Sequence, residues 1–380
     1  MLVAALGLVI AGTVIGVVTL WPEQRTFESP LSSVPDSVPA EVVGLTTVEC
    51  TLAGLTRCQE VLIELHGGPD DGTTQIFSIG QTADDPELGL GDRILVSQRP
   101  EGTLAPGFEG KYAFVDFDRS RPLVVLFVVF AVLVLLLSRW QGLRSLIGVL
   151  GSLLVIVYFV VPAILDGGSP VAVALVGALV VMFLTIPLTH GVGPKTLAAC
   201  LGTAMSLVLT LLVADVATTA ARLTGLASEE GAYLRVAATE VSLSGLLVAG
   251  MVIAALGVLD DLTVSQSSTV FALQAANPTL SIRELFSRGL VVGRDHVAAT
   301  VNTLVLAYAG ASLPILLIFS LGGWSFRGAA TSEVVAAEAV AALVGSIGLV
   351  AAVPVTTGLA AFLASRVEPT ELEHARGHAH

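Results

Sequence analysis

Charged residues are scarce in this chain: Asp, Glu, Lys and Arg make up 13% of its 380 residues, against about 25% in ordinary soluble domains. Lysine is the rarest of the four, with only two copies, Lys111 and Lys195. Hydrophobic residues reach 54%, and the mean hydropathy is +0.86. This composition excludes an ordinary soluble domain and predicts a polytopic α-helical membrane bundle.

Cysteine is also scarce, with three copies, which is too few for a scaffold built on disulfides. Cys200 lies in an apolar run, while Cys50 and Cys58 share a polar segment. These two thiols either form a bridge across a short loop or stay free, and both alternatives remain open. The spacing of Cys50 and Cys58 resembles a hairpin more than a zinc site, because it has no CxxC motif and no paired His, and we expect no metal site and no cofactor.

The chain lacks the motifs of the common hydrolases and nucleotidases: it has no GxSxG nucleophile elbow, no HExxH and no Walker loop. An intramembrane aspartyl hydrolase needs two carboxylates on facing positions that share a proton. Asp260 and Asp261 are adjacent, so Asp295 would have to be the partner. We therefore expect that the protein is not an enzyme.

Residues 22–121 carry 17 acidic and 7 basic side chains, a net charge of −10 within the total of −13. An acidic surface of this kind repels nucleic acid and anionic headgroups, so we expect no nucleic-acid partner. Five short β-type runs lie between Gly, Asp and Pro signals: 41–48, 57–65, 73–79, 93–98 and 112–117. They predict a small all-β, OB-like domain that packs on or docks a protein partner.

Eight apolar runs are each about long enough to cross the ~30 Å hydrocarbon core of a lipid bilayer. They are residues 1–20, 122–138, 145–165, 170–189, 196–214, 241–259, 297–319 and 339–364. The predicted domains are an N-terminal transmembrane anchor (1–21), the β-barrel-like domain (22–121), a seven-helix transmembrane domain (122–365) and a tail (366–380). A short helix on the membrane surface fits the connection 217–237.

The orientation follows from the basic residues in the short connections. With both termini in the cytoplasm, the inner connections hold eight Lys or Arg residues and the outer ones hold three. This distribution predicts a multi-pass protein of the cell membrane with cytoplasmic termini and an extracytoplasmic β domain.

The most polar stretch of the apolar part begins at Asp260 and Asp261, at the end of the uncharged run 241–259. Each ionised carboxylate costs about 2.5–3.5 kcal/mol at the centre of a membrane helix. Consecutive side chains point about 100° apart on a helix, so only one aspartate faces the interior, and we favour Asp261, which shares its face with Ser265. The polar residues expected to line a cytoplasm-facing cavity are Asp260, Asp261, Ser265, Gln266, Asp295, Asn302, Thr303, Tyr308 and Lys195.

Simpler roles remain open for the same residues. The two aspartates end a helix at the membrane interface, or Arg294 and Asp295 form a pair that reaches the headgroups. Asn302 joins two helices by a hydrogen bond, or it contacts a solute. The cavity itself requires Asp261 to lie near Asn302.

Three strings resemble those of the YibE/F-like family of bacterial membrane proteins. They are Thr189-His190-Gly191 with Lys195-Thr196-Leu197, then Gly257-Val258-Leu259-Asp260-Asp261-Leu262, then Gly293-Arg294-Asp295 with Asn302-Thr303-Leu304 and Tyr308. The Gly91-Asp92 turn and residues 112–116 are also similar. The resemblance implies a multi-spanning membrane protein with a small extracytoplasmic β domain, and it carries no settled activity.

Two hypotheses about function follow. The first is permease-like transport of an ion or small polar solute, because polar groups kept in apolar spans usually face a bundle interior or a water path. The alternative is a non-transporting membrane receptor or assembly factor that binds a protein partner through its acidic β domain. The sequence shows no second copy of the aspartate motif, so the inverted repeat of many transporters is not visible.

Overall fold

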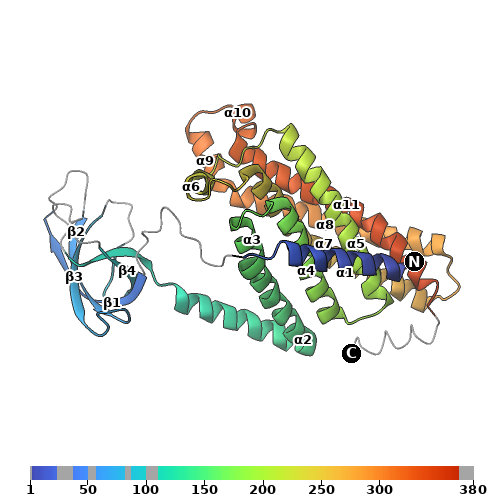
Figure 1. Ribbon diagram of the computed structural model, residues 1–380, viewed down its shortest axis with the longest axis horizontal. Coiled ribbons are helices and arrows are strands. Elements are labelled where there is room, and N and C mark those ends of the chain that lie inside the picture. Colours follow the sequence, from blue (N-terminus) through green and yellow to red (C-terminus); the bar gives the residue numbers. More distant parts are fainter. Residues whose placement is uncertain (1, 24–36, 50–56, 82–86, 100–109, 368–380) are drawn as a thin grey trace. The chain divides into compact units, whose positions relative to one another are not determined.

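The structure is a computed structural model that describes residues 2–23, 37–49, 57–81, 87–99 and 110–367. The chain divides into two compact units, which are described separately. The helical unit is Met1–Phe27 with Ser138–His380, and the β unit is Glu28–Leu137. Figure 1 shows both as ribbons.

The β unit contains one antiparallel five-stranded sheet in the order β3-β2-β1-β4-β5. The strands are β1 (Ser37–Val48), β2 (Arg57–Leu65), β3 (Thr74–Gln81), β4 (Arg93–Gln98) and β5 (Tyr112–Phe117). The edge strands β3 and β5 also contact each other, so the sheet is curled. All five predicted strands are confirmed. β1 begins four residues earlier than predicted because Ser37 pairs with Ser97 of β4.

Alternating side chains build the core of the β unit. Val61, Ile63 and Leu65 of β2 are fully buried, as a strand with one face on a core requires. Cys50 lies outside the described residues, so the bridge from Cys50 to Cys58 stays a prediction.

Asp70, in the turn between β2 and β3, connects this turn to the start of β5. Its carboxylate accepts a hydrogen bond from the Tyr112 hydroxyl at 2.7 Å and another from Lys111. These hydrogen bonds, first that from Lys111, lower the pKa of Asp70 below its ordinary value of 3.8. Burial raises the pKa of Tyr112 to about 12, and the bond to Asp70 adds to the rise.

The remaining elements are helices. Their bounds are α1 (Leu2–Thr19), α2 (Ser120–Val155), the π-helix η1 (Ile156–Val160), α3 (Val161–Leu165), α4 (Pro170–His190), α5 (Pro194–Ala220), α6 (Glu229–Ala237), α7 (Leu243–Ala276), α8 (Ile282–Ala311), α9 (Leu313–Leu321), α10 (Phe326–Ala330) and α11 (Glu333–Ala364). The short helix α6 lies within the connection 217–237, where a short helix was expected.

Within the described residues, six helices are long and apolar enough to cross a membrane. The number is seven if α8 and α9, which are bent by 55°, count as one span. The sequence predicted eight, and the difference lies in Ser120–Leu165, one stretch of 46 residues. The helix is interrupted at Arg139, where φ is 49° and ψ is −122°.

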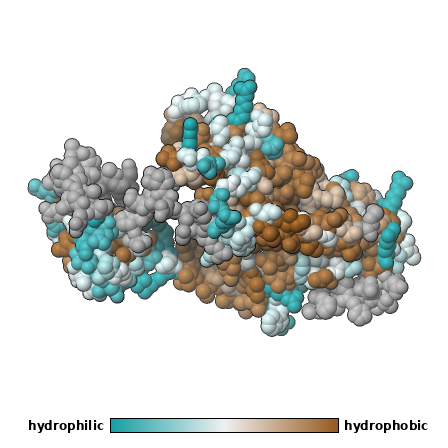
Figure 2. Space-filling view, in the orientation of Figure 1, coloured by the Kyte–Doolittle hydropathy of each residue, from teal (hydrophilic) through white to brown (hydrophobic). Residues whose placement is uncertain are grey.

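The core of the helical unit lies where α5, α7 and α11 pack together, with α4 and α8 against α7. Small residues allow the close approach: a Cβ at Gly202 would lie 2.2 Å from Thr356 Oγ1, and one at Gly348 would lie 2.1 Å from Thr210 Oγ1. Hydrophobic side chains cover much of the visible surface of the helical unit (Figure 2), as expected of a surface that faces lipid.

α1 begins and α11 ends at the same end of the helical unit, which we call the inner end (Figure 1). The opposite end is the outer end. This arrangement fits two termini on one side of a membrane. That this side is cytoplasmic, and that the β domain lies outside, stay predictions.

Candidate functional site

The polar stretch that begins at Asp260 lies on α7, the central helix of the helical unit. Ser242 caps the start of α7 by accepting a hydrogen bond from the Gly245 amide at 3.2 Å. With 34 residues, α7 is about 51 Å long, so part of it extends beyond the ~30 Å core. Packing against four helices surrounds the polar stretch with possible partners.

Asp260 faces α4. Its Oδ2 accepts a hydrogen bond from the Thr185 hydroxyl at 2.9 Å. Its Oδ1 is buried and has no hydrogen-bond partner. Among the buried side-chain atoms of the described residues that lack a partner, Oδ1 is the one that belongs to an ionisable group.

Asp261 points the other way and is exposed. The preference for Asp261 as the inward-facing aspartate is therefore wrong, and Asp260 takes that place. Neighbouring side chains do point about 100° apart on the helix, but the preference for Asp261 assumed that the face it shares with Ser265 is the buried one. Ser265 lies at the edge of the packed face, where it is only half-buried.

Two hydroxyl contacts join α7 to α5. The hydroxyls of Thr263 and Thr203 lie 2.6 Å apart, and both residues are fully buried. Ser267 donates a hydrogen bond to the Lys195 carbonyl at 2.8 Å. Lys195, a predicted site residue, thus contributes a backbone oxygen to the packing at the start of α5.

Gln266 joins α7 to both α8 and α11. Its Nε2 donates to the Gly289 carbonyl at 2.7 Å and to the Thr357 hydroxyl at 2.8 Å, and its side chain is 1% exposed. Glycine permits the approach of α8, since a Cβ at Gly293 would lie 3.0 Å from Gln266 Oε1 and 2.5 Å from Val353 Cγ1. Gln266 therefore serves as a packing residue in this structure.

Ser265 makes the last of these contacts. Its hydroxyl lies 3.3 Å from His296 Nδ1 on α8 and donates to the Leu262 carbonyl at 3.0 Å. The hydroxyl and the imidazole are both half-buried, so this contact lies at the margin of the packed core.

The structure does not bring the predicted α8 residues to the aspartates. Asp295, Asn302 and Thr303 are exposed, and the Thr303 hydroxyl donates to the Ala299 carbonyl of its own helix at 3.1 Å. Tyr308 is half-buried. Among the hydrogen bonds of the described helices, none joins Asn302 or Tyr308 to Asp260 or Asp261. The predicted cavity, which required Asp261 near Asn302, therefore stays a prediction that these contacts do not support.

Taken together, the polar side chains from Asp260 to Ser267 contact α4, α5, α8 and α11. Packing satisfies most of them, and one carboxylate oxygen is left over. The prediction missed the partners Thr185, Thr203 and Thr357. Each is a hydroxyl in a mostly apolar run, and this was the signal that could have identified them as sites of contact between helices.

A family model described as YibE/F-like protein matches residues 126–366. The chain belongs to the YibE/F-like family. The match covers both the aspartate stretch of α7 and the polar positions of α8, which carried the resemblance in the sequence. No curated protein and no solved structure matches the chain.

The YibE/F-like match begins at residue 126, after the last strand of the sheet, β5. The similarity of the Gly91-Asp92 turn and of residues 112–116 to the family therefore stays a prediction. Within the described part of the chain, no group of three or more His, Cys, Asp or Glu side chains could hold a metal ion.

Proposed function

We propose that this YibE/F-like protein is a permease-like membrane protein that moves an ion or small polar solute, and that Asp260 binds the moving cation or proton. The observation that carries the proposal is the buried Asp260 Oδ1 without a hydrogen-bond partner. A carboxylate that exists only to join two helices would be expected to use both oxygens. The free Oδ1 and the Thr185 hydroxyl, which is bonded to the other oxygen of the same carboxylate, offer two oxygen ligands to a small cation.

A seam of hydroxyl groups between α5 and α11 supports the same proposal. Ser206 Oγ and Thr356 Oγ1 are buried there without partners, close to the Gly202 and Gly348 contacts. Polar groups kept inside membrane helices usually face a bundle interior or a water path. Solute movement along this seam would give these hydroxyls transient partners.

For the β unit we propose an OB-like fold on the extracytoplasmic side. The sheet order, together with the contact of β3 with β5, gives the cyclic neighbour order 1-2-3-5-4. This is a small, partly closed barrel of the kind that OB domains form.

Flux into liposomes tests the transport proposal. The full chain is reconstituted in lipid vesicles that contain a pH-sensitive dye, and proton flux is driven by a potassium diffusion potential. Parallel vesicles with ion-sensitive dyes test sodium, potassium and magnesium. Transport predicts flux above that of empty vesicles for at least one of these ions and loss of that flux in Asp260→Asn. Wild-type vesicles as tight as empty ones for all of them would contradict the proposal.

The acidic β unit supports a second candidate function, that of a non-transporting receptor or assembly factor. Residues 22–121 hold most of the negative charge of the chain and include a sheet with its own core. This candidate predicts that replacing 22–121 with a flexible linker abolishes function in cells and that Asp260→Asn is harmless. Transport predicts that Asp260→Asn abolishes function.

A further inference from the structure

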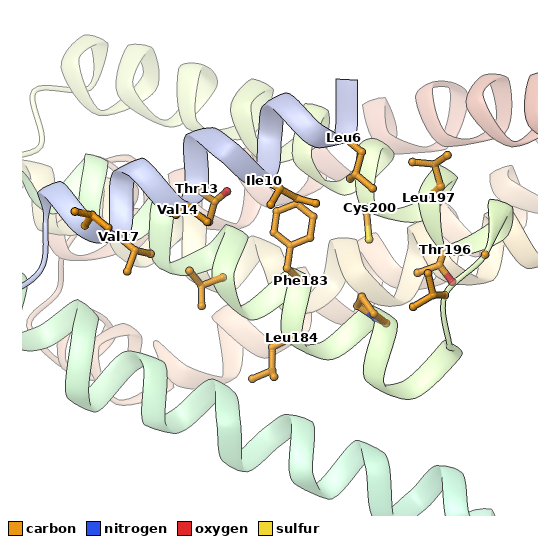
Figure 3. A pocket seen from close by; sticks show the side chains of 15 residues that line it. Leu6, Ile10, Thr13, Val14, Val17, Phe183, Leu184, Thr196, Leu197 and Cys200 are labelled. Carbon is orange, nitrogen blue, oxygen red and sulfur yellow. The ribbon is translucent and has the colours of Figure 1, made fainter. Parts of the chain in front are cut away.

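An apolar cavity of about 640 Å³ lies between α1, α4 and α5. Six of its fifteen lining residues come from α1, between Leu6 and Val18. Figure 3 shows these side chains along one face of the cavity, with Phe183 and Leu184 of α4 opposite and Cys200 near one end. The hydroxyls of Thr13 and Thr196 in the lining are already bonded to carbonyls, at 2.8 and 2.7 Å. The cavity therefore offers apolar surface almost exclusively.

The cavity exists because α1 is fixed at its outer end and loosely packed elsewhere. At the outer end, the rings of Trp21 and Phe159 lie 5.9 Å apart, and the Glu23 amide donates to Asp166 at 2.8 Å. Gly16 lies so close to α4 that a Cβ there would be 2.6 Å from Val176. A Cβ at Gly7 or Gly12, toward the inner end, would meet no atom within 4 Å.

The depth of the cavity matches one leaflet of a bilayer. α4, with 21 residues, is about 31 Å long, close to the ~30 Å hydrocarbon core. Its cavity-lining residues run from Val180, near the middle of the helix, to Pro187, and the turn at Gly193 closes the inner end. From Val180 to Gly191 the helix rises about 16 Å, compared with about 15 Å for half of the core.

The inner end of the cavity lies beside polar groups. The turn between α4 and α5 is followed by Lys195, and no side chain caps the start of α5, so the first amides of this 27-residue helix are left to other acceptors. An apolar space that reaches from the middle of the membrane to a polar, basic turn matches the two parts of a phospholipid, an apolar acyl chain and a charged headgroup. The cavity is open to the surface of the bundle, since Val14 and Val18 in its lining are 56% and 71% exposed, and at this depth lipid chains are the surrounding solvent.

We infer that this cavity binds one acyl chain of a membrane phospholipid, with the headgroup at the turn between α4 and α5. α1 forms one wall of the site, and the lipid completes the packing of α1 on the bundle. This inference is independent of the proposed transport, because Asp260 does not line the cavity.

Native mass spectrometry of the full chain tests the inference. The protein is purified in mild detergent with added dipalmitoylphosphatidylglycerol, and bound lipid is counted as collision energy rises. Val14 lines the cavity and its neighbour Ile15 does not, while the two side chains are similarly exposed, at 56% and 62%. Val14→Trp therefore places an indole in the cavity, and Ile15→Trp is the matched control. An indole that displaces two methylene groups of the acyl chain from the cavity lowers the affinity for the lipid about tenfold.

The inference predicts one retained lipid in the wild type and in Ile15→Trp, and at least about tenfold less retention in Val14→Trp. If Val14→Trp fails to fold, Leu197→Trp, on the α5 wall, carries the same test. Equal retention in all variants, or no retained lipid in the wild type, would overturn it. So would a dimer that Val14→Trp dissociates, because a second copy of the chain would then cover the cavity.

Discussion

Gln266 gives the sharpest prediction about what holds α8 in place. Gln266→Leu keeps the approximate volume of the side chain and removes both of its hydrogen bonds, to the Gly289 carbonyl and the Thr357 hydroxyl. The Thr357 hydroxyl keeps its own bond to the Val353 carbonyl at 2.6 Å. The substitution therefore removes two bonds without leaving the Thr357 donor unpaired.

The size of the effect follows from these two bonds. Hydrogen bonds between membrane helices average about 0.6 kcal/mol, and neutral hydrogen bonds in proteins generally contribute about 0.5–1.5 kcal/mol. We therefore expect Gln266→Leu to lower the free energy of unfolding by about 1–3 kcal/mol. The loss should be larger for Gln266→Ala, which also opens a cavity.

The assay is equilibrium unfolding of the full chain in mixed micelles with an increasing fraction of dodecyl sulfate. Gln274→Leu is the matched control on the same helix. The Gln274 side chain makes one local bond, to the Pro278 carbonyl at 3.1 Å, and its Oε1 is buried without a partner. Gln274→Leu should therefore lower the free energy of unfolding by less than Gln266→Leu does. A wild-type stability for Gln266→Leu, or a larger loss for Gln274→Leu, would refute the assigned role of Gln266.

Two further predictions concern α8 and the β unit. Gly293→Ala places a Cβ 2.5 Å from Val353 Cγ1 and should lower the free energy of unfolding by about 1–3 kcal/mol. The control is Gly250→Ala, whose Cβ has no atom within 4 Å. It should be neutral or stabilising in the same titration. Because the pKa of Asp70 is lowered, the stability that it contributes is fully present above pH 3.8 and is lost as the pH falls through its native pKa. The stability difference between wild type and Asp70→Asn, followed by circular dichroism, should therefore shrink in acid; a difference that grows there would contradict the prediction.

The sheet could be predicted closely because its signals are local. Alternating apolar residues and Gly, Asp and Pro turns determined four of the five strand starts to within one residue. The earlier start of β1 is a result of strand pairing, since Ser37 and Val38 pair with Ser97 and Val96 of β4. Local patterns carry no information about such a distant partner.

The membrane helices could be located by hydropathy, but their limits could not. Hydropathy marks apolar residues, whereas α7 continues for a further 17 residues after Leu259 through a polar stretch that is stabilised by neighbouring helices. Arg139 separates two predicted spans in the sequence, and in the structure two helices meet at a kink at the same residue.

The candidate site was predicted at the right stretch and on the wrong face. Asp260 and Asp261 differ by one position, and the packing of α4 through Thr185 decides which of them is buried. Asn302 looked like an interior residue because it lies in an apolar run, but α8 is peripheral and presents Asn302 outward. The burial of a helix face depends on its neighbours, which one sequence does not identify.

The ratio of ion flux between two neighbouring variants tests the central claim most directly. Asp260→Asn and Asp261→Asn remove the same charge from adjacent positions, one half-buried and bonded to Thr185 and one exposed. A lost charged ligand costs about 1.5–3 kcal/mol, which is roughly a 10- to 150-fold effect on binding. The account predicts that Asp261→Asn retains the wild-type initial flux and that Asp260→Asn loses at least about tenfold. Equal flux in the two variants, or a loss in Asp261→Asn alone, would contradict it.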